Sequence, residues 1–127
     1  MEDVTKKTWL EVALNGPWTQ EKQARIPIKV EDIVQQGIAC VNAGAAIVHV
    51  HAYDEETGRQ KDDVDVYKKI IEGIRTEVDA IVYPTVSASG MNPIDERSTG
   101  EDRYAHIESL AKDGFLEWTN APFCFVL

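Results

Sequence analysis

The sequence predicts an α/β fold in which parallel strands alternate with helices. Short apolar runs begin near residues 9, 46, 80 and 115, and between them the apolar residues recur at helical spacing. The resulting order is β-α-β-α-β-α-β, with units of about 35 residues, the unit length of a (β/α)8 TIM barrel of roughly 250 residues. We therefore expect residues 1–127 to form the N-terminal half of one such barrel domain, in a truncated chain.

The first two strands flank a well-defined helical pattern. We expect a strand over residues 8–14 that ends at Asn15-Gly16-Pro17, and a second strand over 45–51. The helix between them is predicted over 30–43, because its apolar positions fall on one face: Ile33, Val34, Gly37, Ile38 and Val41. Gly44 is well placed to end this helix.

The second half of the chain repeats the pattern. A helix is predicted over 64–78, with an apolar stripe of Tyr67, Ile70, Ile71, Ile74 and Val78. We expect a third strand over 80–85, a loop rich in Ser, Gly, Asn and Pro over 86–99, and a third helix over about 100–112. In that helix Tyr104, Ile107 and Leu110 face inward, and residues 115–119 begin a fourth strand.

Charge and composition limit the classes of function. With 22 acidic and 13 basic residues the net charge is −9, which argues against a nucleic-acid or anionic-membrane surface. No apolar run approaches the roughly 18 residues of a membrane span, and the N-terminus lacks an apolar signal segment. Cys40 and Cys124 fit no metal or redox spacing. We expect a cytoplasmic protein.

Two histidines end the second predicted strand, in AGAAIVHVHAYDEETGRQKDD (residues 43–63). In a strand, His49 and His51 face the same side, about 6.6 Å apart along the chain, and two such imidazoles can bind one metal ion. They lie at the carboxyl end of a parallel strand, where α/β folds place their chemistry. The alternative is a pair of strand-end histidines satisfied by backbone or water, because the sequence shows no third ligand.

Other polar residues give weaker signals. Asp54, Glu55 and Glu56 are expected in a solvated turn closed by Gly58, and His106 on a helix surface. The pair Asn15-Gly16 either offers a backbone amide to a ligand or forms a simple turn. At the end of the third strand, hydroxyls of Thr85, Ser87 and Ser89 could hold a carboxylate, or belong to a flexible loop.

The segments EVALNGPW, IPIKVEDIV, AGAAIVHVHAYDEETGR, YKKIIEGIR and DAIVYPT together resemble the N-terminal half of the β-keto acid cleavage enzymes. The likeness runs over most of residues 8–120, and AGAAIVHVHAYDEETGR is its most specific part. It implies a metal-dependent (β/α)8 barrel that combines a β-keto acid with acetyl-CoA and releases acetoacetate and a new acyl-CoA. The implied ligands of Zn²⁺, or another divalent transition metal, are His49, His51 and a glutamate from the second half of the barrel.

The resemblance also implies further site residues. Thr85 takes the place of a hydroxyl residue that binds the substrate carboxylate, and a polar cluster of the family falls near Thr119 and Asn120. Ala52-Tyr53 stands where many members have an arginine, and Trp18 stands where some have an acid, with Glu21 the nearest acid. The candidate catalytic residues are therefore Thr85 and Glu21, and the candidate substrate-binding residues are Asn15, Ser87, Thr119 and Asn120.

Three hypotheses follow: an enzyme of this family, a catalytically silent truncated α/β fragment that persists only by association, and another metal-dependent barrel such as an aldolase. Four βα units leave open sheet edges, so we expect association, as a homo-oligomer. Because the third ligand is absent, we expect the 127-residue chain alone to have no measurable cleavage activity.

Overall fold

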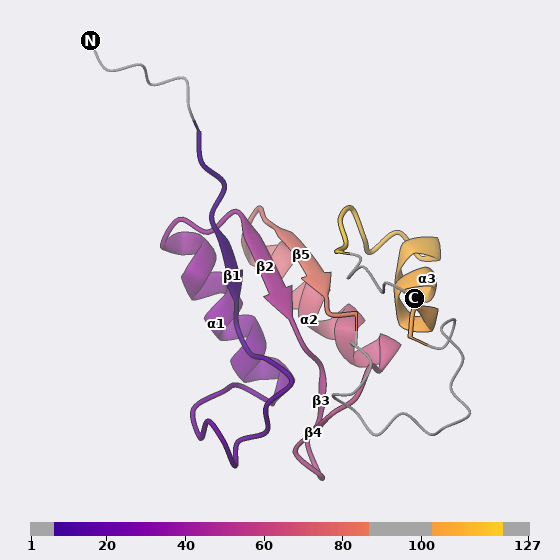
Figure 1. Ribbon diagram of the computed structural model, residues 1–127. Helices are drawn as coiled ribbons and strands as arrows, with labels where there is room; N and C mark the ends of the chain where they lie inside the picture. The colour runs from indigo at the N-terminus through magenta and orange to yellow at the C-terminus, as the bar shows by residue number, and fades with distance from the viewer. Residues whose placement is uncertain (1–6, 87–102, 121–127) are drawn as a thin grey trace, which may run out of the picture.

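The computed structural model describes residues 7–86 and 103–120, and its centre is a parallel three-stranded sheet (Figure 1). The strands β1 (Glu11–Ala13), β2 (Ile47–Val50) and β5 (Ile81–Pro84) lie in the order β1-β2-β5, and both neighbouring pairs are parallel. The predicted strands over 8–14, 45–51 and 80–85 are thus confirmed, each shorter than expected. The parallel pairing of the second and third of them is confirmed as well.

Helices α1 (Val30–Asn42) and α2 (Val64–Glu77) connect the strands and cover one face of the sheet (Figure 1). A third helix, α3 (Ala105–Lys112), packs beside α2. These positions agree with the helices predicted from apolar periodicity. Within the described part of the chain, no helix has both the length and the apolar character needed to cross a lipid bilayer.

The helix-covered face of the sheet carries the core, because alternate residues of each strand point towards α1 and α2. Val48, Val50 and Val82 lie on this face and are almost fully buried. They pack with residues of the helices and of the turn after β2, namely Ile33, Ala52, Tyr67, Ile70, Ile71, Ile74 and Leu110. The intervening strand residues, among them His49 and Tyr83, therefore point to the opposite face.

Glycines allow α1 and α2 to pack closely. A Cβ atom on Gly37 of α1 would lie 2.5 Å from Cδ1 of Ile74 in α2. A Cβ atom on Gly73 of α2 would lie 2.9 Å from Cγ2 of Val34 in α1. At each glycine, a branched side chain of the opposite helix fills the space that a side chain would occupy. These two contacts therefore set the distance between the helices.

A short antiparallel hairpin of β3 (Tyr53–Asp54) and β4 (Arg59–Gln60) follows β2. Its turn is the predicted solvated one: the Asp54 side chain accepts hydrogen bonds from the backbone N–H groups of Glu56 and Thr57. Gly58 closes it with a φ of 66°, a conformation that glycine adopts without strain. The Glu55 carboxylate also accepts from the backbone N–H of Val30, at 3.3 Å, and so caps the first turn of α1.

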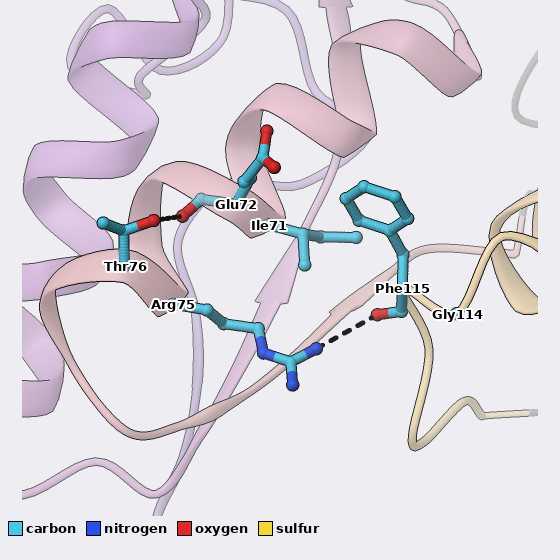
Figure 2. Close-up of a pocket in the computed structure, with 6 residues that line it drawn as sticks. All are labelled: Ile71, Glu72, Arg75, Thr76, Gly114 and Phe115. Atoms are coloured by element: carbon cyan, nitrogen blue, oxygen red, sulfur yellow. Dashed lines mark hydrogen bonds between the residues drawn. The ribbon is translucent and has the colours of Figure 1, made fainter.

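The prediction of a fourth strand over residues 115–119 is wrong, because this segment forms no strand and pairs with none among residues 7–86 and 103–120. The backbone N–H of Phe115 closes α3 by donating to the carbonyl of Leu110 at 2.9 Å, with Gly114 at a φ of 78°. The Arg75 guanidinium donates a hydrogen bond to the carbonyl of Phe115 at 3.4 Å, as Figure 2 shows, and also binds the Glu117 carboxylate. The backbone N–H and carbonyl of Phe115, at the start of the predicted strand, are therefore already paired.

A pocket of about 370 Å³ lies where this segment meets α2 (Figure 2). Its lining consists of Ile71, Glu72, Arg75, Thr76, Gly114 and Phe115. None of these residues is among the candidate site residues, so the pocket is separate from the histidine pair.

We expect Gly37→Ala to destabilise the chain. Overpacking against Ile74 typically costs ~1–3 kcal/mol, and the better helix propensity of alanine returns about 1 kcal/mol, so the free energy of unfolding should fall by up to ~2 kcal/mol. Denaturant unfolding measures the change. In an Ile74→Val background, which lacks the Cδ1 atom, the loss caused by Gly37→Ala should shrink. An equal loss in both backgrounds would show that this contact does not limit helix packing.

Candidate functional site

His49 and His51 lie side by side on the face of the sheet that α1 and α2 leave free. Their ring centroids are 5.0 Å apart, with an angle of 82° between the ring planes. The two side chains therefore point to the same side, as their spacing in the strand predicts. His51 is buried, with 7% of its surface exposed, and His49 is partly buried. The carboxyl end of β2 thus carries two adjacent, largely desolvated imidazoles.

The backbone of His51 is held by the side chain of Asn15. The Asn15 Oδ1 atom accepts from the His51 backbone N–H at 2.8 Å, and Nδ2 donates to the His51 carbonyl at 3.1 Å. Nδ2 also donates to the carbonyl of Pro27 at 2.9 Å. The Asn15 amide thus extends the β1–β2 pairing beyond the end of the ladder. Since both of its N–H groups are used, a role in substrate binding falls to its backbone amide or to the remaining Oδ1 lone pair.

The ring of His51 is oriented by the hairpin. Its Nδ1 atom lies 2.9 Å from Oε1 of Gln60 in β4. Burial lowers the pKa of His51, and the hydrogen bond to Gln60 and the Asp62 carboxylate oppose this shift. The ring is therefore neutral near pH 7, with one nitrogen engaged by Gln60.

His49 is held differently. Its ring packs against the ring of Tyr83 at a centroid distance of 4.7 Å, and its buried Nδ1 atom has no hydrogen-bond partner among the described residues. Burial, followed by the neighbouring His51, lowers the pKa of His49 to about 4, and the Glu11 carboxylate opposes this shift. A neutral imidazole with an unpartnered buried nitrogen can act as a metal ligand, and burying it without a partner otherwise costs free energy.

Glu11 and Tyr83 adjoin the histidines on the same face. The Tyr83 hydroxyl donates to the Glu11 carboxylate across the intervening strand β2. Burial, together with this carboxylate, raises the pKa of the Tyr83 hydroxyl, which therefore stays protonated. No cluster of three or more His, Cys, Asp and Glu residues suited to a metal ion occurs in residues 7–86 and 103–120. The described part of the chain thus brings together two histidines that could bind a metal ion.

Thr85 follows β5 in the position next to His51. Its backbone N–H donates to the carbonyl of Val50 at 2.9 Å, and its carbonyl lies 2.7 Å from Nε2 of His106. The residue is buried, and strand alternation places its hydroxyl on the face of Tyr83 and the histidine pair. Thr85 thus lies where a group bound beside His51 could be contacted.

The prediction that His106 lies on a helix surface is wrong. Only 4% of its surface is exposed, because α3 packs beside α2 and the ring stacks on that of Tyr67 at 5.5 Å. Its Nε2 supplies the donor that the carbonyl of Thr85 needs beyond the strand end. The charged residues near His106 in sequence gave no signal of this role.

The other candidates are not brought to the pair by any described contact. Glu21 is exposed in the loop between β1 and α1, and Thr119 and Asn120 are exposed after α3. Within the ranges that the structure describes, no hydrogen bond or ion pair joins these three residues to either histidine. Ser87 lies outside the described residues. Their catalytic and binding roles stay predictions.

Comparison with known proteins identifies the relatives of this chain. A model of the beta-keto acid cleavage enzyme family matches residues 7–117. The chain is 27% identical over 119 residues to the 3-dehydrocarnitine:acetyl-CoA trimethylamine transferase of Rhizobium meliloti, covering 82% of this chain and 40% of the relative. It is 33% identical over 79 residues to the 3-keto-5-aminohexanoate cleavage enzyme of Fusobacterium nucleatum, covering 61% and 29%.

A third relative is the 3,5-dioxohexanoate:acetyl-CoA acetone transferase of Paraburkholderia graminis, 31% identical over 72 residues, or 57% of this chain and 23% of the relative. The matched regions span less than half the length of each relative. Two of the three names specify acetyl-CoA.

We expect the stability of the chain to depend on the protonation of His49. The pKa of His49 is about 4 in the folded chain, against 6.5 for an ordinary imidazole, so the unfolded chain binds more protons between these values. The free energy of unfolding should fall as the pH is lowered from 6.5 towards 4 and change no further on this account below the folded pKa. Denaturant unfolding at a series of pH values, compared with His49→Gln, tests this. Identical pH profiles for the two proteins would refute it.

Asn15→Ala should destabilise the end of β2. It leaves the backbone N–H and carbonyl of His51 and the carbonyl of Pro27 without their partner, and a buried unpaired group costs ~1–3 kcal/mol. The free energy of unfolding should fall by at least this amount. Asn42→Ala, at an exposed position of α1, is the matched control and should change it little. Equal effects of the two substitutions would show that the Asn15 side chain does not stabilise the backbone at His51.

Proposed function

The chain belongs to the beta-keto acid cleavage enzyme family, and on this basis we propose that it provides the first half of a metal-dependent (β/α)8 barrel. The proposed reaction converts a β-keto acid and acetyl-CoA into acetoacetate and a new acyl-CoA. The observation that carries the proposal is the pair of neutral, desolvated imidazoles of His49 and His51 at the carboxyl end of a parallel strand. Ligand sites of parallel α/β folds lie at these strand ends.

The residues present fit a Zn²⁺ ion or another divalent transition metal. Two imidazoles face the same space, and a buried Nδ1 of His49 has no partner among the described residues. We propose that His49 and His51 hold the metal, with a third protein ligand from outside the described residues, since open catalytic zinc sites have three protein ligands. When bound, the ion would supply Lewis-acid polarisation of the keto acid carbonyl.

The chain's own side chains would orient the substrate. We propose that the Thr85 hydroxyl donates to the carboxylate of the β-keto acid, since Thr85 lies beside His51 on the same sheet face. Glu21 remains a candidate for proton transfer, and Ser87, Thr119 and Asn120 for substrate contacts.

The position after the histidine pair supplies no positive charge. Ala52 is fully buried in the core, and the Tyr53 hydroxyl binds the carbonyls of Gly16 and Trp18. Whatever acyl group the substrate carries, its binding does not use a cation here. This feature separates the chain from members with an arginine at this place and bears on which β-keto acid is accepted.

Zinc binding is the first test. We expect Zn²⁺ to bind the 127-residue chain with one ion per chain and modest affinity, because two histidines contribute and water completes the shell. Isothermal titration calorimetry measures this. His49→Ala and His51→Ala should each abolish the binding, whereas Glu21→Ala should leave it unchanged. Unchanged binding by either histidine variant would refute the proposed metal site.

The reaction itself can be tested in a chimaera in which residues 7–117 replace the matching part of the Fusobacterium nucleatum relative. We expect acetoacetate release that requires both acetyl-CoA and a β-keto acid, across a panel of keto acids. Introducing His51→Ala should reduce it to background while circular dichroism stays unchanged. Cleavage without acetyl-CoA would instead indicate an aldolase, and a folded chimaera that binds zinc but turns over no keto acid would favour a catalytically silent chain.

A further inference from the structure

A chain of hydrogen bonds runs from the ring of His51 into the core. The Oε1 atom of Gln60 faces His51 Nδ1 at 2.9 Å, and Nε2 of Gln60 donates to Oδ1 of Asp62 at 3.3 Å. The hydroxyl of Tyr67 donates to the same Oδ1 at 3.0 Å and accepts from the backbone N–H of Ala52 at 3.2 Å. The chain thus leaves the ring of His51 and returns to the residue that follows it.

The chemistry of these groups fixes the direction of every bond. A carboxylate only accepts, so Asp62 requires the NH₂ end of the Gln60 amide to face it. The carbonyl end of that amide must then face His51, and a carbonyl also only accepts. The Nδ1 atom of His51 must therefore carry the proton, which leaves the lone pair of the neutral ring on Nε2.

We propose that Asp62, acting through Gln60, is a positioning residue that holds His51 in the Nδ1–H tautomer and thereby selects Nε2 as its metal-binding atom. The metal part of this inference rests on the proposed function, and the tautomer part does not. Carboxylate groups that act on a ligand histidine from outside the ligand shell fix its tautomer and orientation.

Tyr67 keeps Asp62 in place. Its side chain is fully buried, and burial raises the pKa of its hydroxyl well above the usual value, so the hydroxyl remains a donor. Because Tyr67 accepts from the N–H of Ala52, its own proton is directed to Asp62. The carboxylate is therefore held from α2, a rigid element, and the hairpin alone does not determine its position.

The chain contains its own reference for a tautomer measurement. It has three histidines, and the Nε2 of His106 faces the carbonyl of Thr85, which only accepts. His106 must thus carry its proton on Nε2, the opposite tautomer to that inferred for His51. Both assignments can be read from one spectrum of the metal-free chain, without turnover or bound zinc.

The experiment is long-range ¹H–¹⁵N NMR of the histidine rings at neutral pH, in the full 127-residue chain. We expect a protonated Nδ1 and a bare Nε2 for His51, and a protonated Nε2 for His106. In Asp62→Ala, which removes the acceptor that requires the NH₂ group of Gln60, the His51 ring should become a mixture of tautomers or reverse. The control Asp65→Ala removes a carboxylate from an exposed position in the first turn of α2, three residues further along the chain, and should leave all rings unchanged.

Zinc titration of the same proteins completes the test. Loss of a positioning residue typically weakens metal binding 10–100-fold, so we expect about this increase in the dissociation constant for Asp62→Ala and none for Asp65→Ala. An Nε2–H tautomer in the unmodified chain, or no tautomer change in folded Asp62→Ala, overturns the inference. If the tautomers behave as expected and no protein binds zinc, the positioning role stands and the proposed metal function fails.

Discussion

The carboxyl end of β2 has to be held after its ladder ends, and the candidate site depends on how this is done. Residues 51 and 52 lie beyond the last ladder pair, and their buried backbone groups need partners. Asn15 pairs with both backbone groups of His51, and Tyr67 accepts from Ala52. Side chains from the loop after β1 and from α2 therefore fix the backbones of His51 and Ala52, and Gln60 of the hairpin fixes the ring of His51.

Core packing decides the direction in which the histidines point. Val48 and Val50 fill the space beneath α1 and α2, so strand alternation sends His49 and His51 to the free face. The helices can close on the valines because Gly37 and Gly73 admit side chains of the opposite helix. A site on such a packed strand holds its geometry better than one on a loop, which suits a metal ion that needs defined ligand positions.

Burial also sets the charge state of the site. It lowers the pKa of both histidines and raises the pKa of Tyr83 and Tyr67, so near pH 7 the imidazoles are neutral and the phenols are protonated. The same desolvation that costs folding free energy at low pH therefore prepares lone pairs for a ligand and donors for fixed hydrogen bonds. The Glu11 carboxylate, which accepts a hydrogen bond from the Tyr83 hydroxyl, places a negative charge on this face and opposes the lowering of the His49 pKa.

The sequence by itself determined the α/β class, the three strands of the parallel sheet, the three helices, and the placement of His49 beside His51, because these follow from spacings of two to four residues along the chain. It did not determine the hairpin cap on α1, the burial of His106 or the absence of a strand over 115–119. It also did not reveal the hydrogen bonds of the Asn15 side chain to the His51 backbone, which join residues 36 apart in sequence. Nor did it reveal the bond of His106 to Thr85, which joins residues 21 apart. Such contacts form only once the helices have packed, because they are hydrogen bonds to backbone groups that the folded sheet itself leaves unpaired.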